Sequence, residues 1–394
     1  MNIQQRYPAI AYLEQKAKRR IPKFAWDYLV GGGIQETGVV RNRSVLQRRT
    51  LTPKYLRDSQ NPPCISQMLL GNTFDAPFGV APIGLNGLIW PKSSEALSLA
   101  AKEHNVPFVL SLYATTCLED IVRIGGPKNA WFQHYPQNDQ KINQAIVWRA
   151  RDAGYKTLVV TVDVPTTRKV RDIRNGLALP VRLRSKAFLD ILRKPGWGIA
   201  TLRSGLPNFE NWLPHMPEDS KKFQMSKFLE GLPILPHQTT AEELAWFRDI
   251  WSGTMIVKGI LHENEVLKCK KLGIDGVIVS NHGGRQLDEA PSAFEVIETI
   301  RTVVGPDYPL LVDGGIRSGG DVALAIACGA DFVLLGRAFM FGLAALGARG
   351  ASHVMSVLKD EFRSTMLQLG CSGVSDLPKF LSTTDQSRIQ SARL

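Results

Sequence analysis

Short apolar runs recur along the chain at intervals that each leave room for a helix. Each run is rich in Val, Leu, Ile or Phe and ends in polar residues or glycine. Eight such runs are present, at residues 78–84, 107–111, 130–135, 157–163, 255–260, 276–281, 309–315 and 332–337. Near-continuous apolar strands that alternate with helices are typical of a parallel sheet covered on its outer face, and eight units favour closure over an open sheet. The sequence therefore predicts an α/β protein with a (β/α)8 TIM barrel.

Helical periodicity fills the gaps between these runs. It covers residues 94–103, 139–153, 263–271, 293–303 and 321–328. Upstream of the barrel, apolar residues at four-residue steps predict one helix over 12–29, which Gly31, Gly32 and Gly33 end. We expect one domain of 394 residues that comprises an N-terminal extension at 1–76, barrel segments at 77–165 and 252–370, and an insertion at about 174–251.

Charge and cysteine usage narrow the classes of partner. Lys and Arg outnumber Asp and Glu by 48 to 36, and this net charge of +12 favours anionic partners such as small acids, phosphates or acidic lipid. No nucleic-acid reader motif accompanies the charge, so we expect no nucleic-acid binding. The five cysteines are widely spaced without a CxxC pair, so we expect no metal site and no disulfide framework. No apolar run approaches the roughly 20 residues of a membrane span, so we expect any membrane contact to be peripheral.

The sixth apolar run leads into a loop at 280–288 that combines a proton acceptor with a permanent cation. His282 has the side chain whose ordinary pKa lies nearest neutrality, and Arg285 carries a charge suited to a carboxylate. Active sites of such barrels lie at the C-terminal ends of the strands, so we expect the residues at those ends to form one site. They are Gly84, Ser111, Gln133, Tyr135, Thr161, Asp163, Lys258, Ser280, His282, Arg285, Asp313, Gly336 and Arg337.

Further features indicate the chemistry of this site. Asp163 would orient His282 and stabilise its imidazolium. Lys258 would need an anionic partner, which a reduced flavin would supply. The glycine-rich segments 313–320 and 335–337 follow the last two strands, where barrels commonly bind phosphate. No GxGxxG motif links a strand to a helix, so a nicotinamide site is not indicated. A non-redox phosphate-binding isomerase or lyase is an alternative class.

The loop sequence Ser-Asn-His-Gly-Gly-Arg-Gln-Leu-Asp resembles the active-site signature of the FMN-dependent 2-hydroxy acid dehydrogenase and oxidase family, and the similarity extends from about Tyr12 to Cys371. In type the chain is most similar to the membrane-associated L-lactate and (S)-mandelate dehydrogenases. The resemblance implies oxidation of an (S)-2-hydroxy acid to the 2-oxo acid with reduction of FMN, and it implies a homotetramer. An oxygen-dependent oxidase of the same substrates is the nearest alternative.

The resemblance also implies roles for the matching residues. His282 would be the base with Asp163 as its partner, and Arg285 would bind the substrate carboxylate. The other implied contacts are Tyr28 with the carboxylate, Tyr135 with the substrate oxygen, and Lys258 with the flavin N1. The FMN would be held by Pro82, Ile83, Gly84, Ser111, Gln133, Thr161, Ser280, Asp313, Gly314, Gly315, Arg317, Gly336 and Arg337.

One binding position departs from the family pattern. The second carboxylate-binding arginine of the family falls within 163–172, where this chain is one residue short. Counting forward places Arg168 in that role, whereas counting back places Lys169 there. We predict Arg168, because a planar guanidinium can hold a carboxylate through two hydrogen bonds and an ammonium cannot.

Residues around the expected pocket bear on the substrate and the electron acceptor. Gly84 is expected near the substrate. The family's membrane-associated dehydrogenases resemble this chain in having glycine at this position, whereas several oxidases have alanine. We therefore predict a dehydrogenase. Tyr113 is expected to line the pocket, where it would either limit its size or stack on an aromatic substrate. His134 and Pro136 stand where relatives carry apolar residues, and we expect them to reshape the pocket. Lactate and mandelate both remain candidate substrates.

The insertion combines basic, apolar and aromatic residues. It contains the cations Arg182, Arg184, Lys186, Arg193 and Lys194 among Leu, Ile, Phe and Trp residues. This composition suits a peripheral membrane anchor. We therefore predict attachment to the cytoplasmic side of the inner membrane, with a quinone or membrane carrier as electron acceptor. The alternative is an active-site lid with a solvated basic face.

Overall fold

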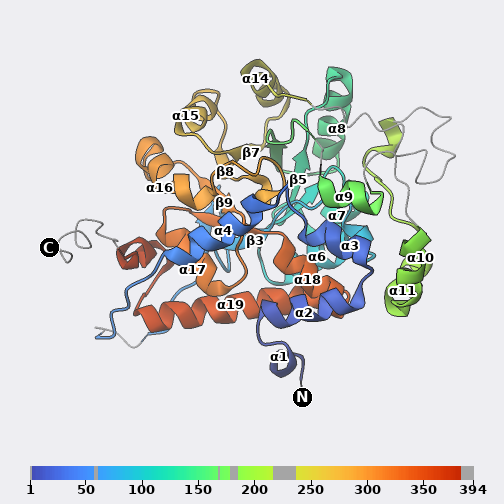
Figure 1. The fold of residues 1–394 in the computed structure, drawn as a ribbon. Helices are drawn as coiled ribbons and strands as arrows, with labels where there is room; N and C mark the ends of the chain where they lie inside the picture. The colour runs from blue at the N-terminus through green and yellow to red at the C-terminus, as the bar shows by residue number, and fades with distance from the viewer. Residues whose placement is uncertain (1, 57–60, 167–168, 178–184, 216–236, 383–394) are drawn as a thin grey trace.

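The barrel predicted from the sequence is confirmed. The computed structural model describes residues 2–56, 61–166, 169–177, 185–215 and 237–382 (Figure 1). Eight parallel strands close in the order β10-β3-β4-β5-β6-β7-β8-β9. They are β3 (Phe78–Val80), β4 (Phe108–Ser111), β5 (Ala130–His134), β6 (Thr157–Thr161), β7 (Thr254–Ile260), β8 (Gly276–Val279), β9 (Leu310–Asp313) and β10 (Phe332–Leu335). Six of the eight strands end one to four residues before the predicted run does, and the residues that follow them belong to loops at the C-terminal ends of the strands.

Helices surround the strands, as Figure 1 shows. Those in the barrel segments are α5 (Asn86–Ile89), α6 (Ser93–Glu103), α7 (Leu118–Gly125), α8 (Gln140–Asp152), α15 (Glu263–Lys271), α16 (Ala293–Val304), α17 (Gly319–Ala327), α18 (Arg337–Leu346) and α19 (Arg349–Leu369). All five predicted helices are present with bounds within two residues. Four of these helices were not predicted, namely α5, α7, α18 and α19.

The prediction of one helix over 12–29 is wrong. The chain forms α2 (Ile10–Arg20) and α3 (Lys23–Val30), separated by Ile21 in an extended conformation. Pro22 explains the break, because a proline ring clashes with a helical conformation of the residue before it. The rest of the N-terminal extension contains α4 (Thr37–Arg48) and a hairpin of β1 (Gln67–Leu69) and β2 (Asn72–Phe74).

The hairpin and the barrel interior belong to one apolar cluster. Phe74 of β2 is buried against Trp131 and Phe332, with ring centroids 6.4 and 5.7 Å away. Val109, Val159, Ile256, Ile278 and Leu311 are fully buried in the same cluster. The interior is therefore packed rather than hollow, and a ligand site is confined to the opposite, C-terminal ends of the strands.

The segment between β6 and β7 has helices of its own; in Figure 1 the first three are green at the right, and the last is olive at the top. They are α9 (Val170–Asn175), α10 (Ser185–Leu192), α11 (Pro195–Ser204), a 3₁₀ turn η1 (Leu213–His215) and α14 (Ala241–Ile250). Trp197 fixes α11 to the body: its indole N–H donates to the Leu88 and Ile89 carbonyls, and its ring meets Phe24 edge-on at 5.7 Å. Among the described helices, none has the length and apolar character needed to cross a bilayer.

Candidate active site

A cavity of about 570 Å³ opens at the C-terminal ends of the strands. Most residues predicted for the site line it, namely Tyr28, Pro82, Ile83, Gly84, Tyr113, Tyr135, Thr161, Lys169, Lys258, His282, Arg285, Asp313, Gly314, Gly315, Arg317, Gly336 and Arg337. Ser111, Gln133, Asp163 and Ser280 lie outside this lining set. Arg168 lies outside the described residues, so the structure places only Lys169 of the two candidates.

His282 is held from two sides. Its Nδ1 lies 2.8 Å from Oδ1 of Asp163, and its backbone N–H donates to Ser280 Oγ at 2.9 Å. The backbone is left-handed at His282, Gly283 and Gly284 in succession, with φ of 57°, 65° and 73°. A Cβ on Gly284 would lie 2.4 Å from the backbone nitrogen of Val39, which explains why glycine stands there. Because Nδ1 contacts Asp163, Nε2 is the nitrogen free to exchange a proton with a ligand.

Burial and charge compete in the His282–Asp163 pair. Burial lowers the pKa of His282 below its ordinary 6.5, although Asp163 opposes this shift. Burial alone would raise the pKa of Asp163, yet the facing His282 and Lys258 lower it overall. At neutral pH the pair is therefore a neutral imidazole on a carboxylate, which is the form a general base requires.

Gly259 allows Asp163 to reach this position. The register between β7 and β8 shifts between Lys258 and Ile260, and Gly259 at the shift has a φ of 105°. A Cβ there would lie 2.4 Å from Cβ and 2.5 Å from Cγ of Asp163. The sequence gives no direct sign of this contact, because it depends on the approach of two neighbouring strands.

Lys258 has a protein carboxylate as its partner. Its ammonium donates to Ser280 Oγ at 2.8 Å and lies 3.0 Å from Oδ2 of Asp313, while Ser280 Oγ donates to Oδ1 of Asp313. Burial would lower the pKa of Lys258, but Asp313 and Asp163 raise it overall. The expectation that a flavin must neutralise this lysine was incomplete, since Asp313 already does so.

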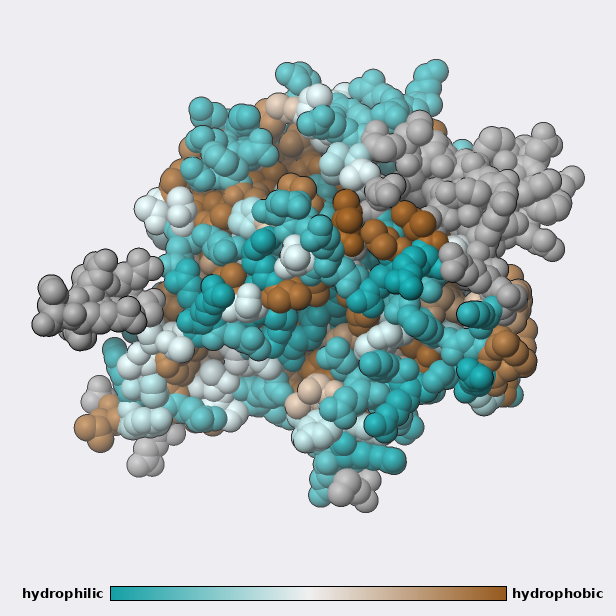
Figure 2. All heavy atoms as spheres, viewed as in Figure 1, coloured by the Kyte–Doolittle hydropathy of each residue, from teal (hydrophilic) through white to brown (hydrophobic). Residues whose placement is uncertain are grey.

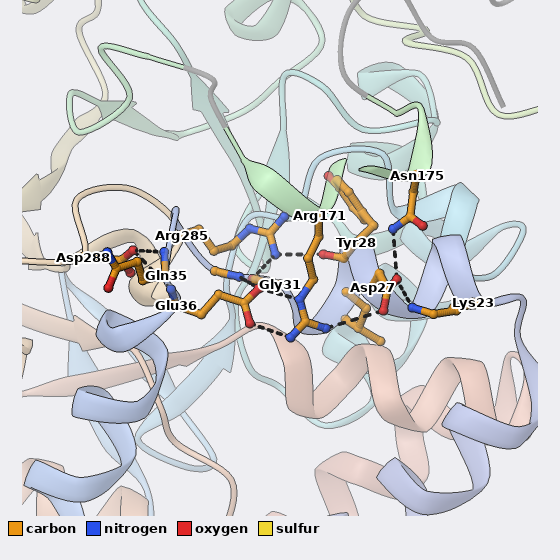
Figure 3. Close-up of polar contacts among 12 residues, drawn as sticks. Lys23, Asp27, Tyr28, Gly31, Gln35, Glu36, Arg171, Asn175, Arg285 and Asp288 are labelled. Carbon is orange, nitrogen blue, oxygen red and sulfur yellow. Dashed lines mark hydrogen bonds and ion pairs between the residues drawn. The ribbon is translucent and has the colours of Figure 1, made fainter. Parts of the chain in front are cut away.

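Tyr28 and Arg285 lie next to each other in the lining of the cavity and form one of its walls (Figure 3). The Arg285 guanidinium stacks 5.1 Å above the Tyr28 ring, and its Nη1 donates to the Tyr28 and Gly31 carbonyls, each at 2.8 Å. The Tyr28 hydroxyl donates to the Gly84 carbonyl at 2.8 Å, and burial raises its pKa to about 12. A permanent cation and a protonated phenol therefore lie together, an arrangement that suits a carboxylate ligand.

The N-terminal helices secure this wall through polar contacts that sequence reasoning missed. Asp288, the last residue of the loop 280–288, accepts hydrogen bonds from the backbone N–H groups of Gln35 and Glu36 at 2.6 and 3.1 Å (Figure 3). Asn42 of α4 and Asn281 exchange two amide hydrogen bonds of 2.8 Å. The N-terminal extension is therefore part of the site, and no local pattern indicates these pairings.

A second set of contacts joins α9 to the same helices (Figure 3). Arg171 forms ion pairs with Glu36 and Asp27, and Asn175 donates to Asp27 at 2.9 Å. The side chain of Arg171 is thus engaged at the base of α9. Lys169, at the N-cap of α9, lines the cavity instead.

The cavity also has the features of a site for a flavin phosphate. Gly314 and Gly315 have φ of 104° and 83°, a conformation that lets consecutive backbone N–H groups approach an anion. Burial lowers the pKa of Arg337 strongly and that of Arg317 to about 10, and neither guanidinium forms an ion pair with any carboxylate in the described part of the chain. Buried cations without a counter-charge favour an anionic ligand.

Unpaired polar atoms near the strand ends fit the flavin ring. Both amide atoms of Gln133 and the hydroxyl of Thr161 are buried with no hydrogen-bond partner among the described residues. Buried polar groups are normally paired, so these atoms indicate a ligand with donors and acceptors along one edge. The residues present therefore fit FMN.

Aromatic side chains form the remaining wall. Tyr113 stacks on Tyr135 with ring centroids 5.2 Å apart, and Phe209 of the insertion meets Tyr113 edge-on at 5.7 Å. Pro136 lines the cavity as expected, but His134 does not: it is fully buried and bonds Asn143 of α8 at 3.0 Å. The expectation that His134 lies in the pocket is wrong, because successive strand residues point to opposite faces.

Part of the insertion contributes to the cavity, whereas its helices α10 and α11 do not. Leu177, Phe209, His237 and Thr239 line the cavity, but no residue of α10 or α11 does. The choice between lid and anchor is thus not exclusive. These four residues of the insertion wall the site, and the α10–α11 pair lies outside the cavity lining.

Comparisons with known proteins agree with this geometry. The family model for FMN-dependent dehydrogenase matches residues 17–383. (S)-Mandelate dehydrogenase of Pseudomonas putida is 37% identical over 92% of this chain and 91% of its own length. A putative L-lactate dehydrogenase of Mycobacterium tuberculosis is 35% identical over 93% and 86%, and an L-lactate oxidase of Nostoc sp. is 34% identical over 92% and 94%. A crystal structure of the monotopic membrane protein (S)-mandelate dehydrogenase superposes with a TM-score of 0.88, at 36% identity, over 95% of this chain and 98% of that one.

Proposed function

This chain belongs to the FMN-dependent dehydrogenase family, and from that premise we propose how its site oxidises an (S)-2-hydroxy acid of the lactate or mandelate type to the 2-oxo acid. The observation that carries the proposal is the His282–Asp163 pair, 2.8 Å apart, in a cavity shared with Arg285 and Tyr28. A base and a carboxylate-binding pair in one cavity match the two functional groups of a 2-hydroxy acid.

In the proposed mechanism, Arg285 and Tyr28 bind the substrate carboxylate and so orient C2 and its hydroxyl towards His282. His282 Nε2 accepts a proton from the substrate, and Asp163 stabilises the resulting imidazolium. Tyr135 hydrogen-bonds the substrate oxygen through its protonated hydroxyl, whose pKa burial raises well above 10. Gly314, Gly315, Arg317 and Arg337 would hold the FMN phosphate, and Gln133 and Thr161 would bond the edge of its ring. When bound, FMN would supply the two-electron acceptor. The same base serves whether the hydroxyl proton or the C2 proton leaves first.

Anaerobic flavin bleaching tests this proposal. The FMN-loaded protein should bleach when mixed with (S)-lactate or (S)-mandelate, and His282→Gln should slow bleaching by about 10²–10⁴-fold while FMN stays bound. Undiminished bleaching by the variant would remove His282 from the mechanism. A fully FMN-loaded wild-type protein that neither acid bleaches would overturn the substrate class.

The aromatic wall supports a mandelate-type substrate over lactate. Tyr113, Tyr135 and Phe209 would contact the side chain on C2, and aromatic rings pack well against one another. Faster bleaching by (S)-mandelate than by (S)-lactate is expected. Faster bleaching by lactate would mean that Tyr113 closes the pocket.

We propose a dehydrogenase rather than an oxidase. The support is the position of Gly84: a Cβ there would lie 3.3 Å from Cβ of Tyr113, so alanine would require Tyr113 to shift. The reduced enzyme should pass electrons to a soluble quinone analogue much faster than to air-saturated buffer. Rapid reoxidation by air would instead identify an oxidase.

The proposed membrane contact is the α10–α11 pair, which we call the docking face. Figure 2 shows an apolar patch at the right edge, where Figure 1 places these helices. Its exposed apolar side chains are Phe188, Leu189, Leu192, Ile199, Leu202 and Leu206. Leu192 and Leu202 are 76% and 83% exposed, and so much apolar surface on adjacent helices favours an apolar partner.

Cations beside the docking face favour an anionic bilayer as that partner. The ammonium of Lys194 donates to the Arg19 carbonyl at 2.7 Å, which places the basic end of α2 next to α11. Arg193, Arg203 and Lys18 are exposed. We therefore propose peripheral attachment to the inner face of the cytoplasmic membrane, where a quinone would accept the electrons. A homotetramer stays a prediction of the family resemblance, and light scattering of the purified protein tests it.

A further inference from the structure

The Tyr113 hydroxyl, in the aromatic wall of the cavity, accepts a hydrogen bond from Gln137. The amide Nε2 of Gln137 donates to this hydroxyl at 3.3 Å and to the Tyr135 carbonyl at 2.6 Å. The second contact fixes the orientation of the amide, because a carbonyl can only accept a hydrogen bond and must therefore face the nitrogen. The Tyr113 hydroxyl consequently acts as the acceptor in its contact with Gln137.

This arrangement leaves the proton of the Tyr113 hydroxyl without an acceptor. The hydroxyl forms no other hydrogen bond with the residues that the structure describes. Burial raises the pKa of Tyr113 to about 12, against the effect of the Gln137 hydrogen bond, so the hydroxyl keeps its proton at neutral pH. A buried O–H group that borders a cavity and lacks an acceptor favours a ligand that supplies one.

The amide oxygen of Gln137 is available as well. Its Oε1 has no hydrogen-bond partner within the described ranges, and Gln137 and Tyr113 both line the cavity. The two side chains, which we call the polar pair, therefore offer one donor and one acceptor next to each other. A hydroxyl group matches both, whereas a carboxylate or an ether would place a lone pair opposite the amide oxygen.

The polar pair is held in place before any ligand arrives. Asn143 of α8 accepts a hydrogen bond from the Gln137 backbone N–H and donates one to the Gln137 carbonyl, each at 2.8 Å. Tyr113 lies between Tyr135 and Phe209, whose ring centroids are 5.2 and 5.7 Å away. Binding a ligand would therefore order few side chains, which favours affinity.

Tyr135 connects the polar pair to the catalytic base. Its ring centroid lies 6.4 Å from that of His282 and 5.2 Å from that of Tyr113. A substrate whose C2 lies at His282 and Tyr135 would extend its side chain along Tyr113. The aromatic rings around this path suit an aryl group.

Resting on the proposed function, we propose that Tyr113 and Gln137 bind a hydroxyl group on the substrate side chain. The preferred substrate is then an aryl (S)-2-hydroxy acid with a hydroxyl on its ring, of the 4-hydroxymandelate type. Tyr113 donates to the ring hydroxyl, and the ring hydroxyl donates to Oε1 of Gln137. An aryl acid without this hydroxyl would leave both protein groups unpaired, and a site of this kind discriminates against such a ligand.

Binding of three 2-oxo acids to the FMN-loaded protein tests the proposal. The probes are 4-hydroxybenzoylformate, benzoylformate and 4-methylbenzoylformate, whose methyl group has nearly the size of a hydroxyl but forms no hydrogen bond. Each Kd is measured from the change in flavin absorbance. We expect a Kd about tenfold lower for the hydroxy compound than for the other two, the effect of two net hydrogen bonds.

Variants assign this preference to the polar pair. Tyr113→Phe keeps the ring and removes the hydroxyl, and Gln137→Met keeps the length and removes both amide atoms. In each variant the Kd of benzoylformate should exceed that of 4-hydroxybenzoylformate by about threefold or less. A purely structural role would weaken all three acids alike and would not change this ratio. Tyr12→Phe alters a half-exposed tyrosine of α2 and is the matched control, which should keep the wild-type ratio.

The outcomes separate this inference from the function on which it rests. Equal affinity of the wild type for benzoylformate and 4-hydroxybenzoylformate would overturn the inference and leave the proposed oxidation standing. A tenfold preference that survives in either variant would overturn it too, because the ring hydroxyl would then be recognised elsewhere. If the FMN-loaded protein binds none of the three acids and neither (S)-lactate nor (S)-mandelate bleaches its flavin, the proposed function itself fails.

Discussion

At the scale of single residues, the site depends on a carboxylate that keeps its charge although it is buried. Asp163 contacts His282 and faces the Lys258 ammonium, and these two groups outweigh the cost of burial, which would otherwise favour the protonated acid. His282 in turn stays neutral near pH 7 because burial lowers its pKa. Each partner thus has the protonation state that a proton-accepting step requires.

Asp163→Asn tests this balance. We expect flavin reduction to slow by roughly 10²-fold or more, because an amide cannot stabilise the imidazolium. Asp163 raises the pKa of His282 against the effect of burial, so its loss should move the acid limb of kcat/KM to lower pH. Anaerobic stopped-flow measurements from pH 5 to 8 check both effects. An acid limb that does not move would show that another group controls it.

Gly259 positions Asp163 without touching substrate. In Gly259→Ala the new methyl group would displace Asp163, whose Cβ lies 2.4 Å from that position, so flavin reduction should fall at least tenfold with FMN still bound. Gly154→Ala is the matched control, since Gly154 has a φ of 102° and open space around it. Both variants should lose about 1–3 kcal/mol of stability from backbone strain. Only Gly259→Ala should also move the pH profile, and equal rates in the two variants would contradict the positioning role.

At the scale of elements, the loop 280–288 functions only in combination with α3 and α4. Asp288 accepts hydrogen bonds from the backbone N–H groups just before α4, and Asn42 of α4 pairs with Asn281. Arg285 donates hydrogen bonds to carbonyls at the end of α3. The loop therefore has a fixed shape because two helices from the other end of the chain provide its hydrogen-bond partners.

Asp288→Ala tests this dependence. It leaves partly buried N–H groups without an acceptor, so we expect the free energy of unfolding to fall by about 1 kcal/mol and the KM for the hydroxy acid to rise. Chemical denaturation and steady-state kinetics measure the two effects. Glu289→Ala removes the adjacent exposed carboxylate and should change neither. Equal stability of both variants would mean that the Asp288 contacts do not hold the loop.

At the scale of the whole molecule, the docking face and the cavity are separate. No residue of α10 or α11 lines the cavity, and Trp197 fixes α11 to the barrel body. The insertion therefore joins a wall of the active site to an apolar surface that does not border the cavity. This arrangement would hold the cavity at a constant orientation to a bilayer.

A double variant, Leu192→Ser with Leu202→Ser, tests the docking face. Sedimentation with anionic phosphatidylglycerol vesicles should fall at least tenfold, because two largely exposed leucines would no longer enter the bilayer. Bleaching by substrate should stay unchanged. Leu367→Ser, an exposed leucine on α19, is the matched control. Unchanged sedimentation of the double variant would refute this face as the membrane contact, and capture by protein rather than lipid would point to a different partner.

How far the sequence could predict this molecule depends on whether a feature is local. The eight strands and five helices follow from apolar periodicity, which is a property of neighbouring residues, and the residues at the strand ends were found because a barrel brings those ends together. Pro22 would have predicted the break between α2 and α3, but the sequence analysis did not use it. The orientation of His134 away from the cavity follows from strand alternation, which was not applied there. Arg168, chosen over Lys169, lies outside the described residues, whereas Lys169 lines the cavity.

The sequence by itself determined the barrel, the set of chemical groups at its mouth and the family, because each depends on residue types at fixed spacing. Only the tertiary structure decided which groups pair. Asp313 neutralises Lys258, Asn42 and Asp288 hold the catalytic loop, and Gly259 makes room for Asp163. These are contacts between segments far apart in the chain, and their energies depend on distance and burial. The order of residues does not specify either quantity until the chain has folded.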